Sequence, residues 1–150
     1  MIPEAIRKEI LIEAPVEVVW ELITEPAYLR RWFTEDAEIE LRAGGAGTLL
    51  MHGTDAYHLV VEAVEPPRRF AFRWVGRPDV TVPDRESLLV EFTLEPESRG
   101  TRLRLVESGF DRLDWTEEEM AKYADDHSSG WQRFLLQLRD LAAAEVAARG

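Results

Sequence analysis

The spacing of hydrophobic residues changes near Thr116. Before this residue, apolar and polar positions mostly alternate, as in half-buried strands; after it, apolar residues recur every three or four positions, as in an amphipathic helix. The segment Thr116–Glu119 is typical of a capping box, in which the threonine hydroxyl accepts a backbone N–H and the glutamate reaches back. A stripe this wide must lie against an apolar surface, and the only large one that the chain offers is its sheet. The stripe comprises Trp131, Phe134, Leu135, Leu138, Leu141 and Ala142.

Strands and two short helices are expected before this point. A first strand is predicted at 6–13, followed by a helix that starts at Ala14-Pro15 and a second that runs from Ala27 to Trp32 or Phe33. About six strands then follow in hairpin succession, at 37–41, up to Met51, and at 57–64, 70–74, 88–94 and 101–105. Residues 76–84 are expected to form the longest loop. Short turns between consecutive strands favour antiparallel pairing, so the fold class is α+β.

Charge and composition narrow the choice of partners. At 150 residues, the chain has the size of one domain, 1–150. Its 29 acidic and 18 basic residues give a net charge of −11, which repels phosphate backbones and anionic lipids, so neither nucleic acid nor membrane is expected as a partner. Cysteine is absent, which excludes disulfides and fits a reducing cytoplasm. The start of the chain has no apolar run suitable for a signal peptide, and we expect a cytoplasmic protein.

Several segments resemble one protein family, in order over nearly the whole chain. They are Ala14–Pro26 followed by Leu29-x-x-Trp32-Phe33, then Leu41–Gly45, Val64–Trp74, Gly100–Leu105 with Ser108–Phe110, and Gly130-Trp131. Together they resemble the Hsp90-ATPase-activator-like (AHSA1-type) branch of the START-like, or SRPBCC, superfamily. The resemblance implies a helix-grip fold of the START/Bet v1-like kind. In this fold a curved antiparallel sheet wraps around a long C-terminal helix, and a cavity lies between them.

If side chains do not fill that cavity, a ligand would lie there. The candidate lining residues are Trp32, Phe33, His52, Tyr57, Trp74, Phe92, Glu107, His127, Trp131, Phe134, Leu135 and Leu138. Trp32-Phe33 ends the second helix, which resembles a lid, so the segment from Trp32 to Thr34 and the turn 53–56 are expected to border the mouth. Plain core packing is an equal interpretation for Trp32 and Trp131, and it is favoured for Trp74, because pockets and cores use the same residue types.

Glu107 is the main polar candidate for a residue that faces the cavity. The alternation of Thr101, Leu103 and Leu105 would continue to Glu107 on the inward face. We favour a strand that ends by Val106, with Glu107 solvated at its rim. In the alternative, Glu107 faces the cavity, and desolvation is expected to raise its pKa.

The three histidines make a weak case for a metal site. His52, His58 and His127 show no ordered spacing, and exposed surface positions are favoured for them. His127 lies four residues before Trp131, so it could edge the cavity. No metal and no cofactor is expected.

Three functions remain open. The leading one is a non-catalytic protein that binds a small hydrophobic or amphipathic ligand between the sheet and the helix. The second, implied by the family, is an Hsp90-type co-chaperone connected with the stress response; against it, eukaryotic members carry an additional N-terminal domain, for which we expect no room here. The third is a cyclase- or hydrolase-like enzyme on an apolar substrate, with Glu107 or His52 as acid or base. No catalytic motif is present, and the oligomeric state is not indicated.

Overall fold

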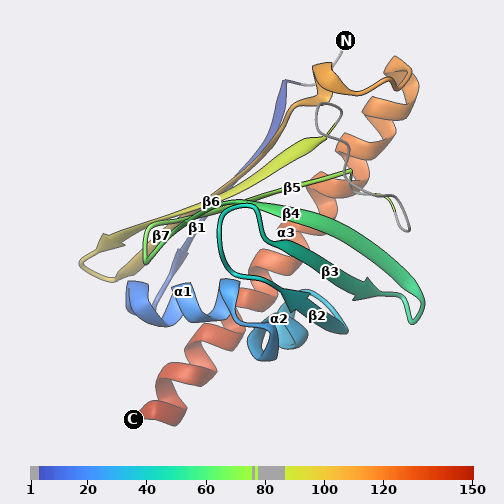
Figure 1. Cartoon of the computed structure of the whole chain (residues 1–150). Helices are drawn as coiled ribbons and strands as arrows, with labels where there is room; N and C mark the ends of the chain where they lie inside the picture. The colour runs from blue at the N-terminus through green and yellow to red at the C-terminus, as the bar shows by residue number, and fades with distance from the viewer. Residues whose placement is uncertain (1–3, 76, 78–86) are drawn as a thin grey trace.

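A curved antiparallel sheet lies against a long C-terminal helix (Figure 1). The computed structural model describes residues 4–75, 77 and 87–150, and within them it contains seven strands, three α-helices and one 3-10 helix. The elements follow in the order β1 (Ala5–Ile12), α1 (Val16–Thr24), α2 (Pro26–Trp32), β2 (Asp36–Ile39), β3 (Ala46–Met51), β4 (Asp55–Glu65), β5 (Arg69–Trp74), β6 (Leu88–Glu97), β7 (Gly100–Ser108), η1 (Phe110–Arg112) and α3 (Glu117–Arg149). This is the α+β helix-grip architecture predicted from the sequence.

The sheet has the order β1-β7-β6-β5-β4-β3-β2, and every neighbouring pair is antiparallel. Six strands form a continuous meander, while β1 pairs with β7 at the far edge. The register of β4 against β5 shifts between Val61 and Ala63. An irregularity of this kind increases local twist and bends a strand, which helps the sheet to curve around α3.

Helix α3 begins as the sequence predicts. The backbone N–H of Glu119 donates to Thr116 Oγ1 at 3.1 Å, and the backbone N–H of Thr116 donates to Glu119 Oε1 at 3.3 Å. The predicted stripe is buried except for Phe134, which is half-buried. It also extends toward the helix start through Met120 and Tyr123, which the sequence analysis did not include.

Most of the space between α3 and the sheet is filled by side chains. Helices α1 and α2 lie beside the C-terminal half of α3 and cover this end of the sheet (Figure 1). A void of about 10 Å³, enough for about one water molecule, lies between these two helices and the sheet. Trp32 belongs to this core: it is 2% exposed, and its indole N–H donates to the carbonyl of Leu22 at 2.7 Å. The side chains of Phe92, Leu135 and Leu138, which were expected to line a central cavity, are packed in the hydrophobic core here.

Several element boundaries differ from the predicted ones, most of them by one to three residues. Helix α2 begins at Pro26, and β6 continues through Pro96 to Glu97, where a turn was expected. The pairing of β6 with β5 ends at Thr93, and the backbone N–H of Leu94 donates to the carbonyl of Arg68. Beyond Leu94 this edge of β6 has no strand partner, so proline is tolerated. The expected loop at 76–84 lies, apart from Arg77, outside the described residues.

Leu138 offers a test of how α3 is held. It is fully buried, at 0% exposure, whereas Leu136, two positions away, is 37% exposed. Leu138→Ala should lower the free energy of unfolding by about 2–5 kcal/mol through lost burial and a residual cavity. Leu136→Ala should change it by less than about 0.5 kcal/mol. Urea unfolding of both variants checks this; equal effects would contradict the assignment of the buried stripe.

Candidate functional site

Glu107 lies in the core, on the inward face of β7. The strand does not end at Val106 but continues to Ser108, and Glu107 pairs with Ile6 on one side and Val90 on the other. Alternation therefore carries its side chain inward, where it is 0% exposed. The favoured expectation of a solvated Glu107 was wrong, and the alternative inward position is confirmed.

Four side chains from two other elements surround the Glu107 carboxylate. Oε2 accepts hydrogen bonds from the indole N–H of Trp74 at 2.8 Å and from the hydroxyl of Tyr123 at 2.6 Å. Oε1 accepts from the indole N–H of Trp131 at 3.0 Å, and the Nδ1 atom of His127 lies 3.4 Å from it. Trp74 comes from β5, and the other three follow one another at four-residue spacing along α3.

The surroundings of Glu107 stabilise its ionised form. Burial acts to raise the pKa of the carboxyl, but the contact with His127 and the hydrogen bonds from Tyr123 and Trp131 outweigh it, so the pKa lies below its usual value. The raised pKa expected for an inward Glu107 was therefore wrong, because that expectation counted desolvation alone. Burial and the nearby Glu107 charge raise the pKa of Tyr123 well above its ordinary value, so its hydroxyl remains a donor.

A pocket of about 350 Å³ opens beside this carboxylate, between α3 and the β3–β5 part of the sheet. Its lining residues are Phe33, Met51, His52, Tyr57, Trp74, Asp126, His127, Gly130, Trp131, Arg133 and Phe134. Trp74, His127 and Trp131 both line the pocket and contact Glu107, so they form a layer between the pocket and the buried charge. His52, Asp126 and Arg133 are exposed and mark the rim.

The walls of the pocket are mainly aromatic. The ring centroids of Phe33 lie 5.3 Å from Trp131 and 5.1 Å from Phe134, and those of Tyr57 and Trp74 are 5.8 Å apart. Apolar walls with a few polar groups are the usual composition of small-molecule sites.

The structure divides the predicted lining residues into three groups. Seven lie in the pocket, namely Phe33, His52, Tyr57, Trp74, His127, Trp131 and Phe134. Four are buried elsewhere in the core, namely Trp32, Phe92, Leu135 and Leu138. Glu107 lies behind the pocket wall. Of the expected mouth, Phe33 lines the pocket, whereas Trp32 and Thr34 are buried and none of residues 53–56 is among the lining residues. Ligand contact by any of these residues remains a prediction.

Sequence reasoning missed five residues of this region. They are Met51, Tyr123, Asp126, Gly130 and Arg133. Tyr123 had a usable signal, because it precedes His127 by four residues and so continues the helical stripe. The rim positions Asp126 and Arg133 had none, because charged residues beside a stripe look like ordinary solvated positions.

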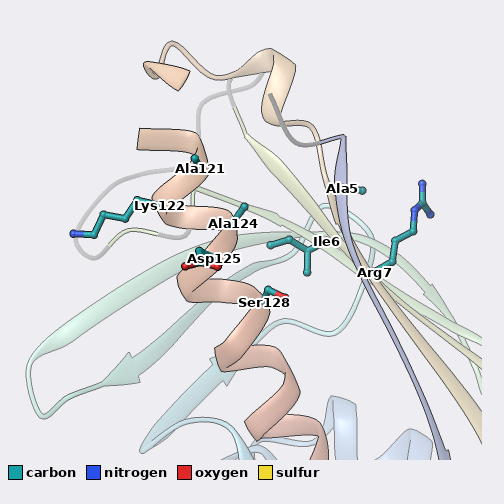
Figure 2. Close-up of a pocket in the computed structure, with 8 residues that line it drawn as sticks. All are labelled: Ala5, Ile6, Arg7, Ala121, Lys122, Ala124, Asp125 and Ser128. Carbon is teal, nitrogen blue, oxygen red and sulfur yellow. The ribbon is translucent and has the colours of Figure 1, made fainter. Parts of the chain in front are cut away.

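A second hollow, of about 700 Å³, lies between the start of β1 and the first turns of α3 (Figure 2). Figure 2 shows Ile6 directed toward α3, whereas Arg7 and Lys122 point away from the intervening space. Small side chains such as Ala121 and Ala124 line much of it, and none of its lining residues, all within the described part of the chain, is aromatic. A groove of this composition offers few contacts to a ligand. We therefore favour the aromatic pocket as the candidate site, although it is the smaller of the two.

Within residues 4–75, 77 and 87–150, no group of three or more His, Cys, Asp or Glu side chains is arranged to hold a metal ion. No helix in those same ranges is both long and apolar enough to cross a membrane.

A family model matches most of the chain. The family described as Activator of Hsp90 ATPase homolog 1-like protein matches residues 13–143. The chain belongs to this family. No curated protein matches the chain. The resemblance drawn from the sequence motifs is thereby confirmed for the AHSA1-like family.

Solved structures share the fold of this AHSA1-like protein. Protein MLL2253 from Mesorhizobium loti is 22% identical with a TM-score of 0.79, over 94% of this chain and 98% of that one. Protein BH1534 from Bacillus halodurans is 26% identical with a TM-score of 0.74, over 95% and 99% of the two chains. The Aha1 dimer from Colwellia psychrerythraea is 22% identical with a TM-score of 0.73, over 92% and 95%. These matches extend over nearly the whole of each chain.

The pKa shift of Glu107 generates a prediction for this AHSA1-like protein. A lowered folded-state pKa contributes stability that is complete above the unfolded-state value of about 4.3 and is lost as the pH falls through the folded-state pKa. Glu107→Gln should therefore lower the free energy of unfolding by about 2 kcal/mol or more at pH 7, and the difference from the parent should shrink below pH 4.

Urea unfolding at pH 7, 5, 4 and 3.5 measures this difference. Exposed carboxylates such as Asp36 and Glu97, whose pKa values are also lowered, are present in both proteins and cancel. Glu38→Gln, at an exposed position of β2, is the matched control and should be neutral throughout. A deficit of Glu107→Gln that grows on acidification would contradict the assigned direction.

Proposed function

We propose that this protein binds a small aromatic or amphipathic molecule in the pocket between α3 and β3–β5, without chemical change to it. The observation that carries the proposal is the pocket itself, which is walled by Phe33, Tyr57, Trp74, Trp131 and Phe134. Stacking and edge contacts with such rings suit a planar apolar body. A volume of about 350 Å³ lies within the range of small-molecule sites.

The inner wall of the pocket is held in place before any ligand arrives. The indoles of Trp74 and Trp131 are fixed by hydrogen bonds to the same buried carboxylate, and the ring of His127 stacks on Tyr123 with centroids 3.6 Å apart. Side chains that are already ordered lose little conformational entropy on binding. This preorganisation supports recognition of a defined molecule.

Glu107 is poorly placed to act as an acid or base on that molecule. Both carboxylate oxygens already accept hydrogen bonds, and the side chain does not line the pocket. Proton transfer requires the donor or acceptor to be within hydrogen-bond reach of the reacting group. His52, the other acid–base candidate, lies exposed at the rim. These positions favour binding over the cyclase- or hydrolase-like alternative.

A co-chaperone function is a second candidate, supported by the family description alone. If it applies, the purified protein should stimulate the ATPase rate of an Hsp90-type chaperone. Such stimulation, retained when the pocket is blocked, would favour this candidate over ligand binding.

Gly130 provides a way to block the pocket. It lines the pocket, and a Cβ built on it meets no other heavy atom within 4 Å, so a larger side chain fits on the helix there. Gly130→Leu should weaken binding of the neutral fluorescent probe N-phenyl-1-naphthylamine at least about tenfold, or 1.4 kcal/mol. Its thermal stability should be equal or higher, because leucine favours a helix over glycine by up to about 1 kcal/mol.

Ser129→Leu is the matched control, since it adds the same side chain to the preceding, exposed position outside the pocket lining. Probe fluorescence titrations should give the parental affinity for this variant. Equal affinities for the parent, Gly130→Leu and Ser129→Leu would remove the pocket as the binding site.

A further inference from the structure

We propose that the molecule bound in this pocket carries a carboxylate, which pairs with the guanidinium of Arg133 at the rim while the aromatic body lies against the inner wall. This inference rests on the proposed binding function and specifies the chemical class of the ligand. It follows from the polar groups that border the aromatic walls.

Arg133 is the permanently charged cation of the pocket lining. Its guanidinium carbon lies 5.1 Å from the ring centroid of Phe134, so the aromatic face holds it at the rim. Within the described residues it forms no ion pair, in contrast to Arg139 and Arg149 on the same helix, which contact Asp140 and Glu21 at 3.4 and 2.6 Å. A planar guanidinium presents two parallel N–H groups that match a carboxylate.

The neighbouring polar groups also favour an anion. The two ring nitrogens of His127 diverge, so with Nδ1 at Glu107 its Nε2 faces away from the buried carboxylate, and His52 adds a second imidazole at the rim. Asp126 is the one carboxylate among the lining residues, all of which the structure describes, and it is exposed. The Glu107 charge lies behind the wall and is compensated by its own donors.

The net charge of −11 repels an anionic ligand at long range, but it does not decide whether the ligand binds once it contacts the pocket. At about 0.15 M ionic strength, interactions between exposed charges farther apart than about 8 Å are largely screened. The guanidinium is the charge nearest to a carboxylate at the rim, so local pairing should outweigh the distant acidic surface.

Three isosteric probes test the inference: naphthalene-2-carboxylate, the neutral 2-carboxamide and the cationic 2-carboxamidine. Isothermal titration at pH 7.5 and 0.15 M salt should show the carboxylate binding about fivefold or more tightly than the carboxamide, and the carboxamidine most weakly. Arg133→Gln should remove the preference for the carboxylate, so that the ratio of the carboxylate and carboxamide affinities falls to about one. Arg139→Gln, outside the pocket on the same helix, should leave all three affinities as in the parent.

The outcomes separate the two proposals. A carboxamide or carboxamidine that binds as tightly as the carboxylate, or a preference that survives Arg133→Gln, overturns the inference while the pocket remains a binding site. If none of the three probes binds, the inference is overturned, and the proposed function is decided by the N-phenyl-1-naphthylamine titrations. If Gly130→Leu leaves the binding of both the carboxylate and N-phenyl-1-naphthylamine at parental strength, both proposals are overturned.

Discussion

The placement of α3 on the sheet depends on one buried charge. The Glu107 carboxylate on β7 receives hydrogen bonds from Trp74 on β5 and from Tyr123 and Trp131 on α3. An ionised carboxylate in an apolar core is costly unless it is hydrogen-bonded on both oxygens. Sliding α3 by one turn would displace the hydroxyl of Tyr123 and the indole of Trp131 from the carboxylate oxygens to which they donate, although Trp74 on β5 would stay in place. The network therefore specifies the register between helix and sheet, which apolar packing by itself leaves less sharply defined.

The same interaction orients part of the pocket wall. Beside the C-terminal half of α3, the short helices α1 and α2 add large side chains, and a void of about 10 Å³ lies between them and the sheet. Near Glu107, the donors Trp74 and Trp131 are oriented by the charge behind them, with their rings in the wall of the pocket. The pocket thus lies where side-chain orientation is set by hydrogen bonding to a fixed anion.

Local patterns were enough to predict the elements of this fold. The capping box at Thr116 and the alternation of the strands act through neighbouring residues, so they are visible in the sequence. The candidate site was harder to predict from the sequence, because its polar centre depends on residues far apart in the chain. The end of β7 could not be placed, since pairing with both β1 and β6 extends it to Ser108. Donors that reverse the expected pKa shift of Glu107 come from β5 and α3, which no local pattern brings together. Trp32 and Phe33 illustrate the same limit: they are adjacent and both aromatic, yet one lies in the core and the other in the pocket.

The pairing of β1 with β7 has a consequence for how the chain reaches this structure. Ile12 pairs with Thr101 and Ala5 with Ser108, so the first strand has no pairing partner until β7, the last strand, has been synthesised. Contacts between residues so distant in the chain carry a large loop-closure entropy and slow folding. During synthesis, the meander from β2 to β7 can form hairpin by hairpin, while β1 remains unpaired until β7 is available. The last assembly steps are therefore the docking of the first strand and of the last helix, and it is the helix that supplies three of the four side chains around Glu107.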